Sequence, residues 1–259
     1  MNRFDGILIC SDIDGTLAFR RDVPAKNLDA IAYFQSRGGR FTVATGRNFR
    51  YLYRLPAVKV NAQIITENGA RIFDPELGRT LWEFPLDSSE ILLEWIDAQQ
   101  VPKVCLGFTD EYVEGVSGSV LEAVLSHKTG ELLQVICGWF ATEEETMAFR
   151  DKARKTFGMR YEICRSWSHG VEFISPLGGK GNSLRCLKTI LAPQVKTVIA
   201  VGDFENDAPL LRCADRGFAP ANACPETLGE AEAVLCRFEE GAVADLIERL
   251  DREYEGGLL

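Results

Sequence analysis

Apolar runs that end in polar residues alternate with helix-like segments at the start of the chain. Residues 6–11 are mainly apolar and polar residues 12–16 follow at once, the pattern of a strand buried on both faces that ends in a loop. Apolar residues at helical spacing after Pro24 predict a helix that ends at Gly38-Gly39, and residues 40–44 form a second apolar run. We therefore predict a βαβ unit whose two strands both end in polar residues.

The pattern changes twice further along the chain. Strands at 62–66 and 71–73 flank the turn signal Asn68-Gly69. A further strand is expected at 80–84. A mixture of helices and strands then runs from residue 86 to residue 176, with expected helices after Ser88 and Thr142 and expected strands at 101–107, 111–113, 161–164 and 171–174. After residue 176 the α/β alternation resumes, with helices expected at 181–191, 207–213 and 242–250 and strands at 197–201 and near 217.

Repeated βα units predict the fold class. They indicate an α/β protein with a doubly wound, Rossmann-like parallel sheet and helices on both faces. We expect residues 1–85 and 177–259 to form this core domain and residues 86–176 to form an inserted α+β domain. In such sheets ligands bind beyond the carboxyl ends of the strands, so polar residues at those ends are the functional candidates.

Charge narrows the classes of partner. The 259-residue chain carries a formal net charge of −9, which argues against a general affinity for nucleic acid or for an anionic membrane. A phosphate site would have to be a local exception, built from fixed donors, a lysine or a metal ion.

No apolar run approaches the roughly 20 residues of a membrane span, and no signal-peptide pattern opens the chain. We expect a cytoplasmic protein and predict no protein partner.

The cysteines and histidines do not indicate a metal or disulfide framework. The eight cysteines are scattered without a CxxC pair, and the chain has only two histidines, His127 and His169. Free cysteine is most often a small buried hydrophobic residue, and we interpret these cysteines in that way. A zinc site is not expected.

Acidic residues follow two of the predicted core strands. Asp12 and Asp14 follow the first, Asp203 and Asp207 follow the strand at 197–201, and Thr45 follows the second strand. Like charges gathered at one sheet edge repel each other unless a cation lies between them. Carboxylates without Cys or His ligands favour a hard cation such as Mg²⁺. Taken alone, Asp-x-Asp-Gly-Thr could also be an ordinary turn.

Four segments occur in the order known from one enzyme family. They are Asp12-Ile13-Asp14-Gly15-Thr16, Ala44-Thr45-Gly46-Arg47, Gly179-Lys180-Gly181-Asn182-Ser183 and Gly202-Asp203-Phe204-Glu205-Asn206-Asp207. Together they resemble the haloacid dehalogenase (HAD) superfamily of phosphohydrolases. The turn Glu67-Asn68-Gly69-Ala70 and the run 217–223 are similar to its Cof-type subfamily, which carries a large α+β (type IIB) cap. Over 86–176 the resemblance rests on position and length.

The resemblance implies a role for each matching residue. Asp12 would be the nucleophile, Asp14 the general acid and then the general base, and Lys180 the cation beside Asp12. The phosphoryl oxygens would be bound by Thr45 and Gly46, with Asn206 reaching the substrate or holding its loop. Mg²⁺ would be held by Asp12, Asp203 and the backbone carbonyl of Asp14, with Asp207 supporting Lys180 or a metal-bound water.

The expected function is that of a Mg²⁺-dependent phosphatase. It would hydrolyse phosphate monoesters of small metabolites, with sugar phosphates favoured, through an aspartyl-phosphate intermediate. A phosphosugar mutase and a catalytically idle phosphometabolite-binding protein are the alternatives. Substrate contacts by Arg47, Trp167 and His169 stay open, and Phe204-Glu205 is bulkier than the family pattern, which bears on substrate choice.

Overall fold

A five-stranded parallel sheet forms the centre of the molecule. The computed structural model describes residues 2–55 and 57–256, and the strand order of this sheet is β13-β12-β11-β1-β2. The strands are β1 (Ile7–Ser11), β2 (Arg40–Val43), β11 (Thr197–Val201), β12 (Arg216–Pro220) and β13 (Ala233–Leu235). All four pairings are parallel, so the carboxyl ends of the strands meet at one edge. The predicted α/β fold is confirmed.

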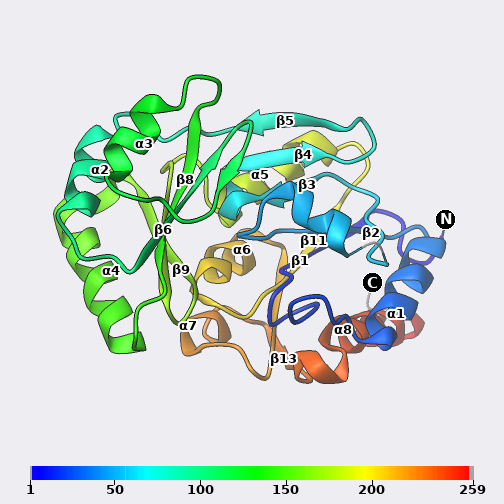
Figure 1. Ribbon diagram of the computed structural model, residues 1–259. Coiled ribbons are helices and arrows are strands. Elements are labelled where there is room, and N and C mark those ends of the chain that lie inside the picture. The colour runs from blue at the N-terminus through cyan, green and yellow to red at the C-terminus, as the bar shows by residue number, and fades with distance from the viewer. Residues whose placement is uncertain (1, 56, 257–259) are drawn as a thin grey trace.

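Helices cover both faces of this sheet because its strands are apolar on both faces. Along β1, Ile7 and Ile9 belong to one apolar cluster, while Leu8 and Cys10 belong to another, as the two-residue period of a strand requires. Helices α1 (Ala25–Ser36) and α8 (Ala242–Glu255) pack side by side against the first face (Figure 1). The second cluster contains residues of α5 (Lys180–Leu191) and α6 (Ala208–Cys213), and the short α7 (Pro225–Leu228) packs on α6.

A small antiparallel sheet follows the second strand. It contains β3 (Ile64–Thr66), β4 (Arg71–Asp74) and β5 (Arg79–Glu83), and a bridge between Ala44 and Ile65 joins it to the end of β2. The predicted hairpin is present, and its turn is the 3-10 segment η2 (Glu67–Gly69). Glu67, Asn68 and Gly69 have φ values of 47°, 54° and 93°. Two consecutive non-glycine residues in the left-handed region are costly, and such strain is typical of functional sites.

Residues between β5 and α5 form a second, antiparallel sheet with helices on one side. Its order is β7-β6-β8-β10-β9, with β6 (Lys103–Phe108), β7 (Tyr112–Val113), β8 (Leu132–Gly138), β9 (Glu162–Trp167) and β10 (Gly170–Ile174). Its helices are α2 (Glu90–Asp97), α3 (Val120–Ser126) and α4 (Glu143–Phe157). We call this region the cap. It lies beside the core at the left of Figure 1, and its aromatic cluster packs Trp95 against Phe149, Phe157 and Phe173.

Two cap elements were not predicted from the sequence. Strand β8 is buried along its whole length, so it shows no alternation of polar and apolar residues, and such runs resemble buried helices. Helix α3 has seven residues, too few for a clear helical period. Five 3-10 segments complete the described elements: η1 (Phe49–Arg54), η2 (given above), η3 (Gly158–Arg160), η4 (Glu205–Asp207) and η5 (Phe238–Glu240).

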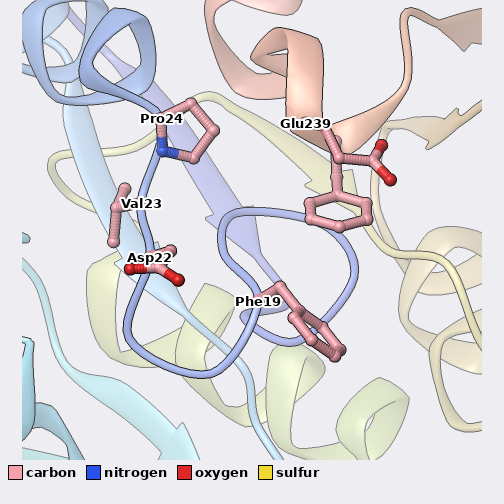
Figure 2. A pocket seen from close by; sticks show the side chains of 6 residues that line it. Phe19, Asp22, Val23, Pro24 and Glu239 are labelled. Atoms are coloured by element: carbon pink, nitrogen blue, oxygen red, sulfur yellow. The ribbon is translucent and has the colours of Figure 1, made fainter.

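An apolar hollow lies on the surface away from the sheet edge. It lies where the loop after β1 approaches η5 and is lined by Phe19, Asp22, Val23, Pro24, Phe238 and Glu239 (Figure 2). None of the predicted site residues lines it. Among the described helices, none has the length and unbroken apolar character needed to cross a bilayer.

Candidate active site

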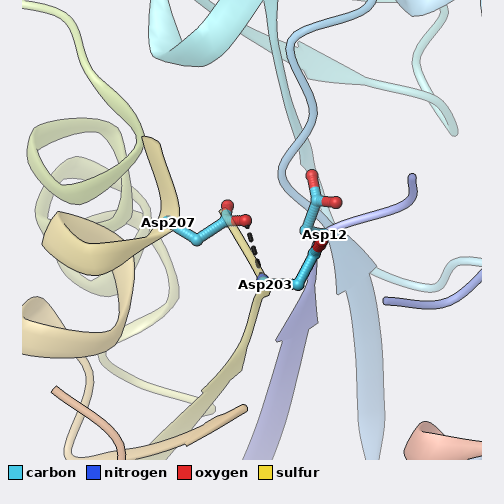
Figure 3. Close-up of side chains that lie close together, drawn as sticks. All are labelled: Asp12, Asp203 and Asp207. Carbon is cyan, nitrogen blue, oxygen red and sulfur yellow. Dashed lines mark hydrogen bonds between the residues drawn. The ribbon is translucent and has the colours of Figure 1, made fainter. Parts of the chain in front are cut away.

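Three carboxylates meet at the carboxyl edge of the parallel sheet. Asp12 follows β1 directly, whereas Asp203 and Asp207 lie in the loop after β11, and their oxygen atoms lie within 4.8 Å of one another (Figure 3). All three residues are buried. Parallel pairing of β1 with β11 brings together side chains that are about 190 positions apart in the sequence.

A buried lysine joins two of these carboxylates. Lys180 is the first residue of α5, and its Nζ lies 2.6 Å from Asp12 Oδ1 and 2.6 Å from Asp207 Oδ1. Burial by itself lowers the pKa of Lys180, but the charges and hydrogen bonds of Asp12 and Asp207 outweigh this effect and the pKa is raised. The lysine is therefore a fixed cation beside the predicted nucleophile.

One cation does not neutralise three acids. Burial raises the pKa of Asp12 well above its usual value, and the charges of Asp207, Asp203 and Asp14 add to this effect, while Lys180 opposes it. The pKa of Asp203 is raised to about 7, by burial and then by the charge of Asp207. Because the buried carboxylates outnumber the single lysine, the site favours the binding of a further cation.

The loop around the cluster is held by local hydrogen bonds. Asp207 Oδ2 accepts the backbone N–H groups of Asp203 at 3.0 Å and Phe204 at 3.1 Å, and Thr16 donates its hydroxyl to Asp203 Oδ1 at 2.7 Å. Gly15 has a φ of 91°, and a Cβ there would lie 2.4 Å from Asp203 Oδ2. The glycine therefore permits the close approach of the loops that follow β1 and β11.

Asp14 lies apart from the three-carboxylate cluster. Its two oxygens accept hydrogen bonds from Arg47, with Nε at 2.5 Å from Oδ2 and Nη2 at 2.8 Å from Oδ1. The guanidinium of Arg47 also lies 4.0 Å from the ring centroid of Tyr51. Both Arg47 and Asp14 are partly exposed, so this ion pair stands at the open side of the site.

The predicted phosphate-binding residues surround the same edge. Thr45 is buried and its Oγ1 accepts the backbone N–H of Arg47 at 3.1 Å. A Cβ at Gly46 would make tight contacts of 3.1–3.2 Å with the side chains of Asn68 and Ser166. Asn206 Nδ2 donates to Asn68 Oδ1 at 2.8 Å, while its buried Oδ1 has no hydrogen-bond partner in the described structure.

A polar cluster between core and cap was missed from the sequence. Asn68 Nδ2 donates to Ser166 Oγ at 2.8 Å and to Glu172 Oε2 at 2.6 Å, and Gln134 also donates to Glu172. Asn68 entered the sequence analysis only as a turn residue. The signal that could have found this cluster is Glu172 itself, a single acid inside the apolar run 171–174.

Three residues flagged or set aside in the sequence have other surroundings. His169 Nδ1 lies 3.0 Å from the carbonyl oxygen of Phe140, inside the cap. The Trp167 ring packs edge-on against Trp139 at 5.9 Å between ring centroids. His127 Nε2 pairs with Asp110 at 2.8 Å. No hydrogen bond recorded in the described structure joins any of the three to a predicted site residue.

A cavity of about 310 Å³ lies next to Lys180 and Asn206. Cap residues of β9 and core residues at the starts of α5 and α6 line it, among them Glu162, Cys164, Asn182 and Arg185. Lys180 and Asn206 therefore border a space between the two regions, whereas Thr45 and Gly46 do not line it.

The comparisons agree with this arrangement. The family model of haloacid dehalogenase-like hydrolases matches residues 9–247. The chain is 26% identical over 245 residues to an HMP-PP phosphatase of Escherichia coli O8 (strain IAI1), covering 86% of this chain and 87% of that protein. It is 25% identical over 283 residues to Phosphatase YwpJ of Bacillus subtilis (strain 168), covering 94% and 99%.

A solved structure shares the fold. The structure of a haloacid dehalogenase-like hydrolase from B. subtilis superposes with a TM-score of 0.81 at 22% sequence identity, covering 94% of this chain and 99% of that chain. Because the family model spans nearly the whole sequence and the acidic cluster stands at the expected sheet edge, the chain belongs to the haloacid dehalogenase-like hydrolases of the Cof type and is a phosphohydrolase.

Proposed function

We propose that this phosphohydrolase is a Mg²⁺-dependent phosphatase that transfers the phosphoryl group of a small metabolite to Asp12 and then to water. The observation that carries the proposal is the position of Lys180, which is 2.6 Å from both Asp12 and Asp207 and beside Asp203. A carboxylate is a weak nucleophile, so it needs an electrophilic phosphorus held in line. Lys180 and a bound metal ion would make the phosphorus more electrophilic and hold the phosphoryl group in place.

The donor set fits Mg²⁺. Asp12 and Asp203 offer carboxylate oxygens, the family pattern adds the backbone carbonyl of Asp14, and no cysteine or histidine takes part. Burial, and after it the charge of Asp207, raises the pKa of Asp203, and a bound divalent cation would offset both effects. When bound, Mg²⁺ would draw the substrate phosphate into an otherwise acidic site and polarise it.

The chain's own residues account for the remaining steps. Asp14 would protonate the leaving oxygen and then take a proton from the water that cleaves the aspartyl phosphate. Thr45 and Gly46 would donate hydrogen bonds to phosphoryl oxygens. The amide of Asn206 donates to Asn68 and Ser166, so its unpartnered Oδ1 would instead accept a hydrogen bond from a hydroxyl of the substrate. Asp207 would keep Lys180 and the 203–204 backbone in place.

The substrate class is a small phosphorylated metabolite in the cytoplasm. Sugar phosphates remain the favoured class, because Asn68, Asn182 and Asn206 line the cavity beside Lys180 and their amides suit a leaving group with several hydroxyl groups. The relative's substrate, HMP-PP, belongs in the same screen. A panel of phosphorylated metabolites, ranked by kcat/KM, identifies the class.

The test compares Asp12→Asn with Asp29→Asn, a matched change at an exposed position on α1. We expect Mg²⁺-dependent hydrolysis of p-nitrophenyl phosphate by the wild type and by Asp29→Asn, and none by Asp12→Asn. Ligand-induced stabilisation without any turnover by the wild type would instead indicate a phosphometabolite-binding protein. Transfer of phosphate between positions of one sugar, without release, would indicate a mutase.

A further inference from the structure

Two arginines of the cap bind one acid in the catalytic loop. Glu205 lies between Asp203 and Asp207, and Arg150 of α4 contacts both of its carboxylate oxygens, at 2.7 and 2.8 Å. Arg165 of β9 adds two hydrogen bonds to Glu205 Oε1, at 2.9 and 2.6 Å. The side chains of Glu205, Arg165 and Arg150 are only 7%, 5% and 11% exposed. We call this group the cap–loop ion pairs.

The charges are distributed unevenly between the two regions. Each arginine has a second acid inside the cap, since Arg150 pairs with Asp151 at 2.9 Å and Arg165 pairs with Glu143 at 2.8 Å. Glu205 is different, because its recorded side-chain hydrogen bonds all come from these two arginines. The core contributes one carboxylate that only the cap satisfies.

An irregularity in the cap sheet brings a second pair of cap and core residues, Ser166 and Asn206, into contact. The pairing of β10 with β9 shifts between Gly170 and Glu172, where β9 contains one extra residue. Both Arg165 and Ser166 consequently reach the core, a common result of a β-bulge. Ser166 Oγ accepts a hydrogen bond from Asn206 Nδ2 at 3.1 Å. Two consecutive cap residues thus bind two consecutive residues of the catalytic loop.

We propose that Glu205 is a positioning residue, which uses the cap–loop ion pairs to hold the loop of Asp203, Asn206 and Asp207 in its reactive arrangement when the cap is closed. The inference rests on the proposed function of that loop. Arg165 directs Nε and Nη2 of its planar guanidinium to Glu205 Oε1, while Arg150 Nη1 contacts both oxygens, so the two arginines together fix the orientation of the carboxylate as well as its distance. Closure of the cap and completion of the phosphate site would then be one event. Glu205, which is bulkier than the residue expected from the family pattern, would link the closure of the cap to the completion of the phosphate site.

Glu205→Gln is a clean variant because both arginines keep their partners in the cap. Glu143→Gln is the matched control, since it removes the other acid bound to Arg165 without touching the core. Hydrogen–deuterium exchange of peptides covering 162–167 and 203–207 reports the contact directly. The kinetic readouts are kcat and KM for p-nitrophenyl phosphate with Mg²⁺, and the inhibition constant of inorganic phosphate. Thermal unfolding checks that each variant is folded.

We expect Glu205→Gln to exchange at least tenfold faster in both peptides, to lose at least tenfold in kcat and to bind phosphate at least fivefold more weakly. Glu143→Gln should stay within twofold of the wild type. Arg165→Lys, which keeps the charge but loses the planar fork, should fall between them and serves if Glu205→Gln does not fold.

The proposal is overturned if Glu205→Gln changes exchange without changing kcat, if it changes neither, or if Glu143→Gln matches it. Should the wild type show no turnover, the proposed function fails, while phosphate binding and exchange still decide the role of Glu205.

Discussion

Arg47 occupies both carboxylate oxygens of Asp14. Asp14, which we propose as the acid for the leaving oxygen, is therefore already held by Arg47 in the absence of substrate. The substrate contact left open for Arg47 would therefore be made by a side chain that is already ion-paired within the site. Substrate phosphate is a natural competitor for such a planar guanidinium.

The two proposed roles of Asp14 can be separated by the choice of leaving group. p-Nitrophenolate leaves without protonation, so Asp14→Asn should still form the aspartyl phosphate from p-nitrophenyl phosphate but should hydrolyse it slowly. We expect a burst of about one nitrophenolate per enzyme, followed by a steady rate about 10²–10⁴-fold lower than that of the wild type. Rapid-quench or stopped-flow absorbance measures the burst. A steady rate equal to that of the wild type would contradict the role of Asp14.

Removing the buried lysine should destabilise the fold as well as the reaction. Lys180→Met leaves Asp12 and Asp207 buried without their cation, and breaking a buried ion pair in this way typically costs about 3–5 kcal/mol. The double variant Lys180→Met/Asp207→Asn should cost less than the sum of the two single changes, because the groups interact directly. Urea unfolding of the four proteins measures the coupling. Additive costs would mean that Lys180 and Asp207 do not stabilise each other.

Magnesium should stabilise the protein more at alkaline than at acidic pH. The pKa of Asp203 is raised to about 7, so below that pH a proton competes with the metal for the carboxylate, and above it the carboxylate is free. The rise in Tm caused by Mg²⁺ should therefore be larger at pH 8 than at pH 6, and it should disappear in Asp203→Asn. Differential scanning fluorimetry with and without Mg²⁺ checks both statements. An equal rise in Asp203→Asn would remove Asp203 from the metal site.

Glu67 should make stability fall as the pH rises. Burial raises the pKa of Glu67 from 4.5 to about 7, although Arg71 opposes this effect. Between these two values the folded protein keeps a proton that the unfolded chain has released, so folding is progressively disfavoured. A shift of this size lowers the free energy of unfolding of the wild type by up to about 3 kcal/mol between pH 4 and pH 8. Glu67→Gln should not show this loss.

The matched control is Glu76→Gln, at an exposed position. Chemical denaturation of the three proteins at several pH values gives the difference in unfolding free energy. If the difference between Glu67→Gln and the wild type does not depend on pH, the buried carboxyl of Glu67 does not titrate in this range.

The sequence by itself determined the parallel sheet and the chemistry at its edge. Fully apolar runs at 6–11 and 197–201 indicate strands buried on both faces, and parallel strands necessarily present their following residues at one edge. Asp12 and Asp203 could therefore be placed together before any contact was known. Local spacing carries this information, because strand period and turn chemistry depend on near neighbours.

Only the tertiary structure decided how the cap meets the core. The bonds from Asn206 to Asn68 and from Arg165 to Glu205 join segments 138 and 40 positions apart, and no periodicity connects them. The turn at Asn68 follows from the local Asn-Gly signal, but its contacts with Ser166 and Asn206 depend on how the cap packs against the core and on the irregular pairing in the cap sheet. Side chains that respond to such packing, unlike those fixed by a strand end, have no local pattern that could reveal them.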